Sequence, residues 1–449
     1  MKHLFSRLSP AQKIILSFLL VIFCGSLLLS LPWVQTASSQ ASYLDHLFTA
    51  VSMVCVTGLF TRSVVDTYNV WGQLLCMLLI QIGGLGILTF IGFFTMESRK
   101  KLSLKDRSIL RDSFSYGHNR TLGQFVRSIF ITTFTIEGLG ALLLMIRFIP
   151  KFGLRKGIFN SIFLAVSAFC NAGFDNFGND SLLGLQTDVL VNITLALLII
   201  TGGLGFMVWF DLATKLGGKQ KGLHFHTKVV LLLTAGLLVF GTVTSLWTEY
   251  NNPGTIGNLS FGDKLLVSFF QTVSMRTAGF ASIDYTAARP VTLFIYLLQM
   301  FLGGAPGGTA GGLKITTFLV LLLFARKEIL GLPHTNMGRR TLAPQLVQKA
   351  FGVTVIFQLT FLLGLLALGL VTDSSHRFIY LIFETVSALA TVGVTANITT
   401  SLNTAGMIVI MLLMFIGRVG PLTLMVSLNH YQPKKAATLH YSKADIMIG

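Results

Sequence analysis

Four short segments of the sequence share one pattern, in which a serine is followed five or six residues later by a glycine. The segments end at Gly58, Gly173, Gly279 and Gly393. Glycine tolerates backbone angles that residues with a Cβ atom resist, and carbonyl oxygens held in line can replace the water shell of a dehydrated cation. These turns therefore favour coordination of a monovalent cation by backbone oxygen atoms.

Three residues of each turn are the candidate ligands, through their backbone carbonyls. They are Val56, Thr57, Gly58, Asn171, Ala172, Gly173, Thr277, Ala278, Gly279, Thr391, Val392 and Gly393. The fourth turn, Thr391–Val394, is close to the TVGYG filter sequence of K⁺ channels, and the other three are looser versions. A single glycine could merely end an interfacial helix, but four copies in register disfavour that interpretation.

A glycine-rich stretch interrupts an apolar run in the third quarter of the chain only. It comprises Gly303, Gly304, Ala305, Pro306, Gly307, Gly308, Thr309, Ala310, Gly311 and Gly312, with Lys314 shortly after. The stretch is not a phosphate-binding loop, because Leu313 separates the glycines from the lysine and no strand precedes them. We expect a flexible loop that lies across a pore below the four turns and acts as a gate. A simple packing kink is the alternative.

Charged residues within apolar segments mark further candidate positions. Arg418 stands where equivalent segments have glycine, and a charge at that depth costs about 2.5–3.5 kcal/mol. We expect its side chain to face a cavity, bind loop carbonyls and oppose cation passage, although a purely structural role is also open. Glu137 has no obvious partner. Asp66, Asp175 and Asp284 follow three of the turns and either concentrate cations at the mouth or are solvated loop charges.

The elements that must position these residues are membrane helices. Apolar residues make up 53% of the chain and charged residues only 11%, far from the roughly 25% charged residues of soluble proteins. Runs long enough to cross a bilayer are Ile14–Leu31, Val70–Met96, Val189–Phe210, Val229–Trp247, Ala350–Val371 and Ala405–Leu428, with interrupted runs at Ser128–Met145 and from Pro290 to Ala325. The sequence predicts an all-α, multi-pass protein of the cell membrane.

Each of the four turns lies between two of these runs, which indicates an internal repeat. A second glycine cluster follows each turn, at Gly83, Gly202, Gly303 and Gly417. Each repeat reads as span, short element, turn, span, and the short elements are too brief to cross a membrane and are expected to be re-entrant. They are 44–53, 157–169, 261–275 and 377–389. Four such units can pack around one axis in a pseudo-fourfold arrangement.

The repeat boundaries follow from this pattern. They are 1–97, 98–213, 214–325 and 326–430, followed by a tail at 431–449. The termini and alternate linkers hold 22 of the 34 lysines and arginines, so the positive-inside rule places both termini in the cytoplasm. The net charge of +17 thus reports topology and contact with the lipid bilayer rather than nucleic-acid binding. No cysteine spacing indicates a disulfide or metal site.

An intramembrane enzyme would need a nucleophile and base, or metal ligands, within the spans. The nine histidines lie in loops, linkers and termini, and no catalytic group emerges. The sequence therefore favours transport over catalysis.

The span, turn and span pattern resembles the Ktr/Trk/HKT superfamily of potassium transporters from about Ser9 to His430. The segments Val166–Phe174 and Arg276–Phe280 are very similar to those of the bacterial Ktr membrane subunit. The resemblance implies a homodimer with one pore per protomer. It also implies a cytosolic nucleotide-binding regulatory ring, and ATP and ADP are expected on that ring and not on this chain. It also implies K⁺ permeation with modest discrimination against Na⁺, since Gly58 is a serine in some Na⁺-favouring relatives. A Na⁺-favouring or Na⁺/K⁺-coupled HKT-type transporter is the alternative, and no covalent cofactor is expected.

Overall fold

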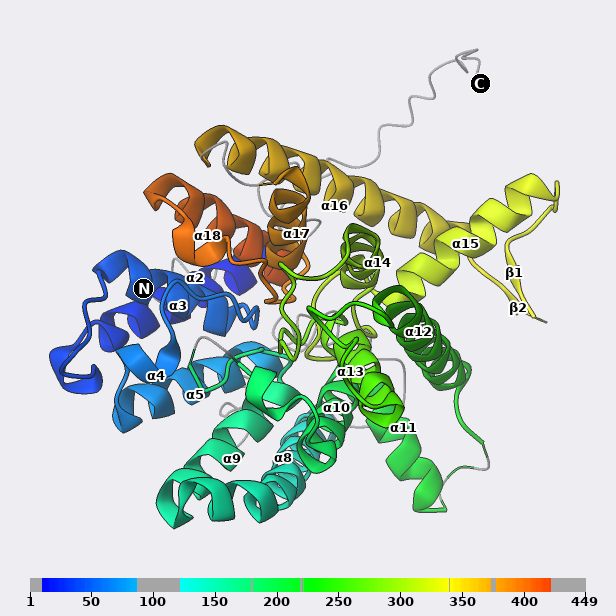
Figure 1. Cartoon of the computed structure of the whole chain (residues 1–449). Helices are drawn as coiled ribbons and strands as arrows, with labels where there is room; N and C mark the ends of the chain where they lie inside the picture. Colours follow the sequence, from blue (N-terminus) through cyan, green and yellow to red (C-terminus); the bar gives the residue numbers. More distant parts are fainter. Residues whose placement is uncertain are drawn as a thin grey trace, which may run out of the picture.

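A computed structural model describes residues 10–86, 122–178, 181–218, 220, 222–338, 340–372 and 377–420. The described chain is mostly helical, and Figure 1 shows its segments following one another in sequence order around a common centre. The longer helices are α2 (Pro10–Leu29), α5 (Val70–Leu85), α8 (Leu122–Phe152), α10 (Val189–Gly203), α11 (Phe206–Leu216), α12 (Phe225–Glu249), α14 (Pro290–Phe301), α15 (Ile315–Ile329), α16 (Pro344–Val371) and α18 (Thr404–Val419).

Four shorter helices coincide with the predicted short elements, and we refer to them as the pore helices. They are α3 (Tyr43–Val54), α9 (Leu154–Phe169), α13 (Phe261–Ser274) and α17 (Phe378–Leu389). Two of them begin at serines whose side chains accept hydrogen bonds from the third helical N–H group, as N-caps commonly do. The short helix α4 (Val64–Thr67) and short 3₁₀ turns lie in connections between longer elements.

The pore helices form the centre of the core. In every repeat the residue four positions before the repeated serine is a phenylalanine that is almost completely buried, namely Phe48, Phe163, Phe270 and Phe383. Burial of a large side chain at the same place in every repeat stabilises the packing of each pore helix in the core. The repeated sequence therefore produces a repeated buried position.

The helix that follows each turn ends or breaks at the second glycine cluster. Helices α5 and α18 end before Gly86 and Gly420, and both glycines have a positive φ, as C-terminal glycines often do. The predicted spans Val70–Met96 and Ala405–Leu428 extend beyond these glycines into residues outside the described chain. The expectation that only the third repeat is interrupted is wrong, because the second repeat is also broken.

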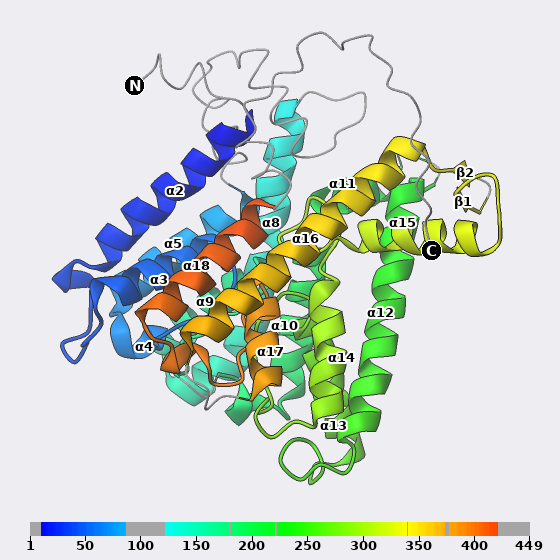
Figure 2. The same cartoon turned by 90° about the horizontal axis from the view of Figure 1, so that it is seen from above.

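The second repeat shows this break most clearly. The predicted span Val189–Phe210 is two helices, α10 and α11, which meet at an angle of 98°. Gly205 lies at the break with φ of 89°, a backbone conformation that glycine adopts readily. In the third repeat α14 and α15 are separated by the predicted glycine-rich loop. Figure 2 shows that α15 runs across the direction of α14.

Four of the described helices, α2, α8, α12 and α16, are long and apolar enough to cross a membrane, and the bent pair α10 and α11 would make a fifth. The shorter apolar helices α5, α14, α17 and α18 lie around the same centre. A two-stranded antiparallel hairpin, β1 (Asn336–Met337) and β2 (Arg340–Thr341), connects α15 to α16. This architecture agrees with the predicted all-α polytopic fold.

Candidate functional site

The four turns follow directly from the C-terminal ends of the pore helices. The C-cap residues are Cys55, Cys170, Met275 and Ala390, and each precedes the candidate ligands by one or two positions. The C-terminus of a helix carries a partial negative charge. Four such ends next to the turns make the region favourable for a cation.

The backbone of each turn alternates between two conformations. The first and third candidate residues have positive φ values, between 51° and 104°, whereas the middle residue does not. The first of these is a residue with a side chain, for example Val56 or Thr391, so the left-handed conformation is strained there. All four turns therefore share one alternating backbone conformation.

The four turns also lie against one another in chain order. A Cβ atom on any of the four glycines would meet the next turn. It would lie 2.7 Å from the Ala172 carbonyl oxygen for Gly58, 2.7 Å from that of Ala278 for Gly173, 2.4 Å from that of Val392 for Gly279, and 1.9 Å from that of Thr57 for Gly393. Each turn thus contacts the next, and the last contacts the first.

The repeated serine supports each turn from the pore helix. Ser52 and Ser387 accept hydrogen bonds from the N–H groups of Gly58 and Gly393, at 3.2 and 3.0 Å. In the second repeat Ser167 accepts from the Phe174 N–H group. In the third, Ser274 donates to the Phe280 carbonyl. The serines were part of the recognised motif, but their role in holding the turns was not predicted.

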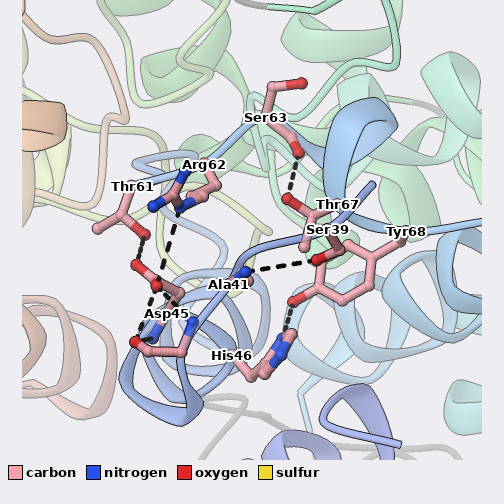
Figure 3. A network of polar contacts seen from close by, with 10 residues as sticks. Ser39, Ala41, Asp45, His46, Thr61, Arg62, Ser63, Thr67 and Tyr68 are labelled. Atoms are coloured by element: carbon pink, nitrogen blue, oxygen red, sulfur yellow. Dashed lines mark hydrogen bonds and ion pairs between the residues drawn. The ribbon is translucent and has the colours of Figure 1, made fainter. Parts of the chain in front are cut away.

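The chain beyond the first turn is tied back to the start of α3 (Figure 3). The Thr61 hydroxyl donates to the Asp45 carboxylate at 2.7 Å, and the Arg62 guanidinium lies 3.9 Å from it. One helical position later, a ring nitrogen of His46 hydrogen bonds the Tyr68 hydroxyl at 2.9 Å. This network fixes both ends of the first turn on one pore helix.

The glycine-rich loop lies directly against the turns on the side of the pore-helix C-termini. The Gly311 N–H group donates to the Thr277 hydroxyl at 3.1 Å, and the Thr309 hydroxyl donates to the Phe169 carbonyl at 3.0 Å. A Cβ atom on Gly311 would lie 1.9 Å from the Thr391 hydroxyl oxygen. The loop therefore contacts the second, third and fourth repeats at once.

The second repeat provides most of the loop's backbone partners. The N–H groups of Ala305 and Thr309 donate to the carbonyls of Gly203 and Gly202, at 2.9 and 3.2 Å. In return, the Phe206 N–H group donates to the Gly307 carbonyl at 3.0 Å. The break between α10 and α11 exposes these backbone groups. The sequence contained the glycine cluster but gave no indication that the loop docks there.

Two cations hold the loop. Arg418 donates to the Thr309 carbonyl at 2.6 Å and to the carbonyls of Gly83 and Gly84 at the end of α5. Lys314 donates to the Ala310 carbonyl at 2.7 Å. Arg418 thus joins the first, third and fourth repeats through backbone oxygen atoms. The side chains of Arg418 and Lys314 thus hold the loop through its backbone carbonyl groups.

Glu137 has a partner that the sequence did not reveal. The Gln81 side-chain amide of α5 donates to both carboxylate oxygens of Glu137, at 3.0 and 3.3 Å, and the Cys170 thiol lies beside them. The pair joins the first and second repeats behind the second turn. Among the described residues, no group of three or more histidine, cysteine, aspartate or glutamate side chains could hold a metal ion.

The acidic residues after the turns form local hydrogen bonds. Asp284 accepts from the N–H and hydroxyl groups of Thr286. Asp175 is buried and accepts from the Ser181 hydroxyl at 2.6 Å and from the Phe177 N–H group. Burial raises the pKa of Asp175 to about 6, even though these two hydrogen bonds act in the opposite direction.

Comparison with known proteins gives one consistent result. Residues 7–438 match the family described as "TrkH: Cation transport protein". The chain is 38% identical to Ktr system potassium uptake protein B of Bacillus subtilis, covering 99% of this chain and 97% of that protein. It is 39% identical to the potassium/sodium uptake protein NtpJ of Enterococcus hirae, covering 100% and 99%. The fold is similar to that of the potassium transporter TrkH from Vibrio parahaemolyticus, with a TM-score of 0.73 and 17% identity over 93% of this chain and 84% of that one.

Proposed function

The chain belongs to the TrkH family of cation transport proteins, and from this premise we propose that it is the membrane subunit of a potassium uptake system. In this proposal K⁺ passes through the ring of four turns, and the glycine-rich loop gates the path. Its relatives are cation transporters and not enzymes. The family and the apolar helices indicate a multi-pass membrane protein, and we propose that both of its termini are cytoplasmic.

The observation that carries this proposal is that the four turns contact one another in a closed ring. Each filter glycine lies so close to a carbonyl group of the next repeat that a Cβ atom would not fit. Close approach of four carbonyl-bearing turns is what coordination of a dehydrated K⁺ requires. The repeated serines then hold the carbonyl directions, because each one binds the backbone of its own turn.

Cation entry is favoured without a fixed negative charge in the ring. The four pore helices end at the turns, so their partial negative charges stabilise a cation between them. Only the fourth turn is close to the K⁺-channel filter sequence. We therefore expect fewer well-formed sites and weaker discrimination against Na⁺ than in a channel with four identical turns.

The gate in this proposal is the loop Gly303–Gly312 together with Arg418 and Lys314. The loop contacts the turns and closes the path below them, and the Arg418 guanidinium joins its Thr309 carbonyl to the carbonyls of Gly83 and Gly84 at the end of α5. A cation at this place also repels K⁺. Opening would break two contacts of the loop. One is its hydrogen bond to the Thr277 hydroxyl, and the other is the hydrogen bond from Arg418 to the Thr309 carbonyl.

A direct test is ion flux through the purified protein in lipid vesicles. Uptake of rubidium as a K⁺ substitute should be competed by K⁺ more strongly than by Na⁺. Vesicles without protein and vesicles with a heat-denatured sample serve as controls. Absence of cation flux above these controls from well-folded protein would exclude the proposed function.

A second function is favoured by the name of one relative. NtpJ is called a potassium/sodium uptake protein, and the alternative is a Na⁺-favouring or Na⁺/K⁺-coupled transporter of the HKT type. The same vesicles separate the two functions. Uptake of rubidium that depends on a sodium gradient, or flux that Na⁺ competes better than K⁺, would support the alternative.

The partners are also part of the proposal. The Ktr names describe proteins of a multi-component uptake system. We propose a homodimer with one pore per protomer and a cytosolic ring of nucleotide-binding subunits, which carries ATP or ADP. The short hairpin of β1 and β2 and the exposed start of α16 offer a surface for that ring.

A further inference from the structure

The corner between α8 and α9 carries an unusual concentration of positive charge. Four of the ten residues from 147 to 156 are basic and none is acidic. These are Arg147, Lys151, Arg155 and Lys156, and all four are exposed. Helices α2 and α8 begin on the same side of the molecule (Figure 2), so this corner lies on the opposite side. In the proposed orientation the cluster is therefore an exception to the positive-inside rule.

The corner is firmly packed, so the positions of the basic residues are well defined. Gly153 links the two helices with φ of 81°. A Cβ atom on Gly157 would lie 2.7 Å from the Ile149 Cα atom, which shows how closely α9 approaches α8. The rings of Phe148, Phe152 and Phe177 pack together beneath the corner, with centroids 5.5–5.7 Å apart.

Most of this positive charge is uncompensated. Arg147 forms an ion pair with Asp188, and the same carboxylate also caps α10 by accepting from the Val191 N–H group. The Lys151 ammonium lies 5.6 Å from the centre of the Phe152 ring. In the part of the chain that the structure describes, Lys151, Arg155 and Lys156 form no ion pair. The corner thus has a net positive charge available for an anion.

A cavity of about 470 Å³ opens between the end of α8 and the loop before α10. Its lining includes Arg147, Lys151, Gly184, Thr187 and Asp188. This volume lies within the range of about 300–1,000 Å³ that small-molecule sites commonly have. Two cationic side chains, one of which is paired with the Asp188 carboxylate, and Thr187 therefore border a space large enough for a lipid headgroup.

An exposed apolar surface leads along α8 to this cavity. Leu139 and Leu143 are 58% and 42% exposed, and they precede Arg147 and Lys151 at intervals of four residues. Residues four apart share one face of a helix. Leu142 and Ile146, also exposed, continue the surface beside them. An acyl chain that lies on these leucines would place its headgroup at the two cations.

We propose that this corner is a binding site for an anionic phospholipid, such as phosphatidylglycerol. The headgroup phosphate lies in the cavity between Arg147 and Lys151, and the acyl chains follow the apolar face of α8. Arg155 and Lys156 lie outside the cavity and contribute only long-range attraction. This site is separate from the ion path, and its occupancy does not depend on the proposed transport function.

Native mass spectrometry of the full-length protein tests this proposal. The protein is released from micelles that contain equal amounts of phosphatidylglycerol and phosphatidylcholine with identical acyl chains. We expect retained phosphatidylglycerol, and the variant R147Q/K151Q should reduce its retention roughly tenfold, because each basic residue adds to the attraction. K151Q alone serves as a second variant, since Lys151 is exposed and forms no ion pair with any residue that the structure describes, so its loss should not destabilise the fold.

The matched control is R155Q/K156Q, which removes the same charge from the same corner but outside the cavity. This control should retain most of its phosphatidylglycerol. Equal losses in the two double variants would show diffuse attraction only and would overturn the proposal. So would retention of phosphatidylcholine at the same level, or displacement of the bound lipid by inorganic phosphate, which would indicate a site for free anions.

Discussion

Gly393 is the most tightly placed glycine of the four turns. A Cβ atom there would lie 1.9 Å from the Thr57 carbonyl oxygen, compared with 2.7 Å between a Cβ on Gly58 and the Ala172 carbonyl oxygen. Both glycines have positive φ values, and that conformation alone costs a residue with a Cβ atom about 1–2 kcal/mol. At the scale of single residues, close contacts between the backbones of different repeats leave no room for a side chain at these two glycines.

We predict that Gly393→Ser and Gly58→Ser lower the preference for K⁺ over Na⁺, with the larger effect at Gly393. The side chain must displace a carbonyl group of the neighbouring turn, whereas the surrounding core is not altered. Relative uptake of the two ions into vesicles measures the effect. Gly138→Ser is the control, because a Cβ atom there has no neighbour within 4 Å. Unchanged relative uptake in both filter variants would contradict the carbonyl-ring filter.

A second prediction at the scale of single residues concerns Asp175 and the pH dependence of cation flux. Burial raises the pKa of this carboxyl group to about 6, so the group is mostly ionised at pH 7 and loses its negative charge as the pH falls through 6. If Asp175 attracts cations to the pore mouth, flux should decline over that pH range, with half of the change near pH 6. Flux measured between pH 5 and pH 8, a range chosen to bracket that pKa of about 6, tests this.

The variant Asp175→Asn should remove this pH dependence and keep a low flux throughout. Asp284→Asn is the matched control, since Asp284 also follows a turn but is exposed. A pH profile of Asp175→Asn that is identical to that of the unmodified protein would assign the dependence to other groups.

At the scale of elements, the glycine-rich loop is held by a small number of specific contacts. Its backbone binds the broken segment between α10 and α11, and Arg418 joins it to the end of α5. A hydrogen bond to a charged group typically contributes about 1.5–3 kcal/mol. Loss of such contacts is enough to change the balance between closed and open positions of a loop.

We predict that Arg418→Gln raises flux roughly tenfold, because a loss of about 1.4 kcal/mol changes an equilibrium by that factor. Deletion of two residues from 306–308 should act in the same direction, since the loop could no longer span the path. Rubidium uptake and the size-exclusion profile are measured together. A well-folded variant whose flux falls to background would show that Arg418 and the loop are structural and do not form a gate.

At the scale of the whole molecule, the loop is continuous with a part of the chain that a partner can reach. Helix α15 begins directly after Lys314 and ends before the hairpin. On this hairpin, the guanidinium carbon of Arg340 lies 4.6 Å from the centre of the Phe225 ring at the start of α12. A force on the hairpin would therefore act on the loop through one helix.

We predict that flux through the complex with the regulatory ring depends on whether ATP or ADP is bound. Charge reversal at Arg340 should weaken this dependence and leave the K⁺ over Na⁺ preference unchanged. The same effect is expected for Arg339, which lies outside the described residues. Arg155→Glu, on the opposite side of the molecule, is the control. Flux that is indifferent to nucleotide, or a change in selectivity at Arg340, would rule out this coupling.

The sequence by itself determined the features that repeat. Apolar runs, a Ser and Gly motif in four copies and two glycine clusters per repeat predicted the all-α fold and the bounds of α3, α9, α13 and α17 to within a few residues. These features depend on local burial and on backbone angles that only glycine adopts readily, and both are visible in residue types and spacing.

Only the tertiary structure decided which segments meet. It showed the contact of Gly393 with Thr57, the Gln81 amide on Glu137, the docking of the loop on Gly202 and Gly203, and the carbonyl groups that Arg418 binds. It also corrected the expectation of one broken helix, because α10 and α11 meet at 98° in the second repeat, where the glycine-rich loop supplies partners for the freed backbone groups. Such partners lie up to 335 residues apart along the chain, and no local pattern specifies them.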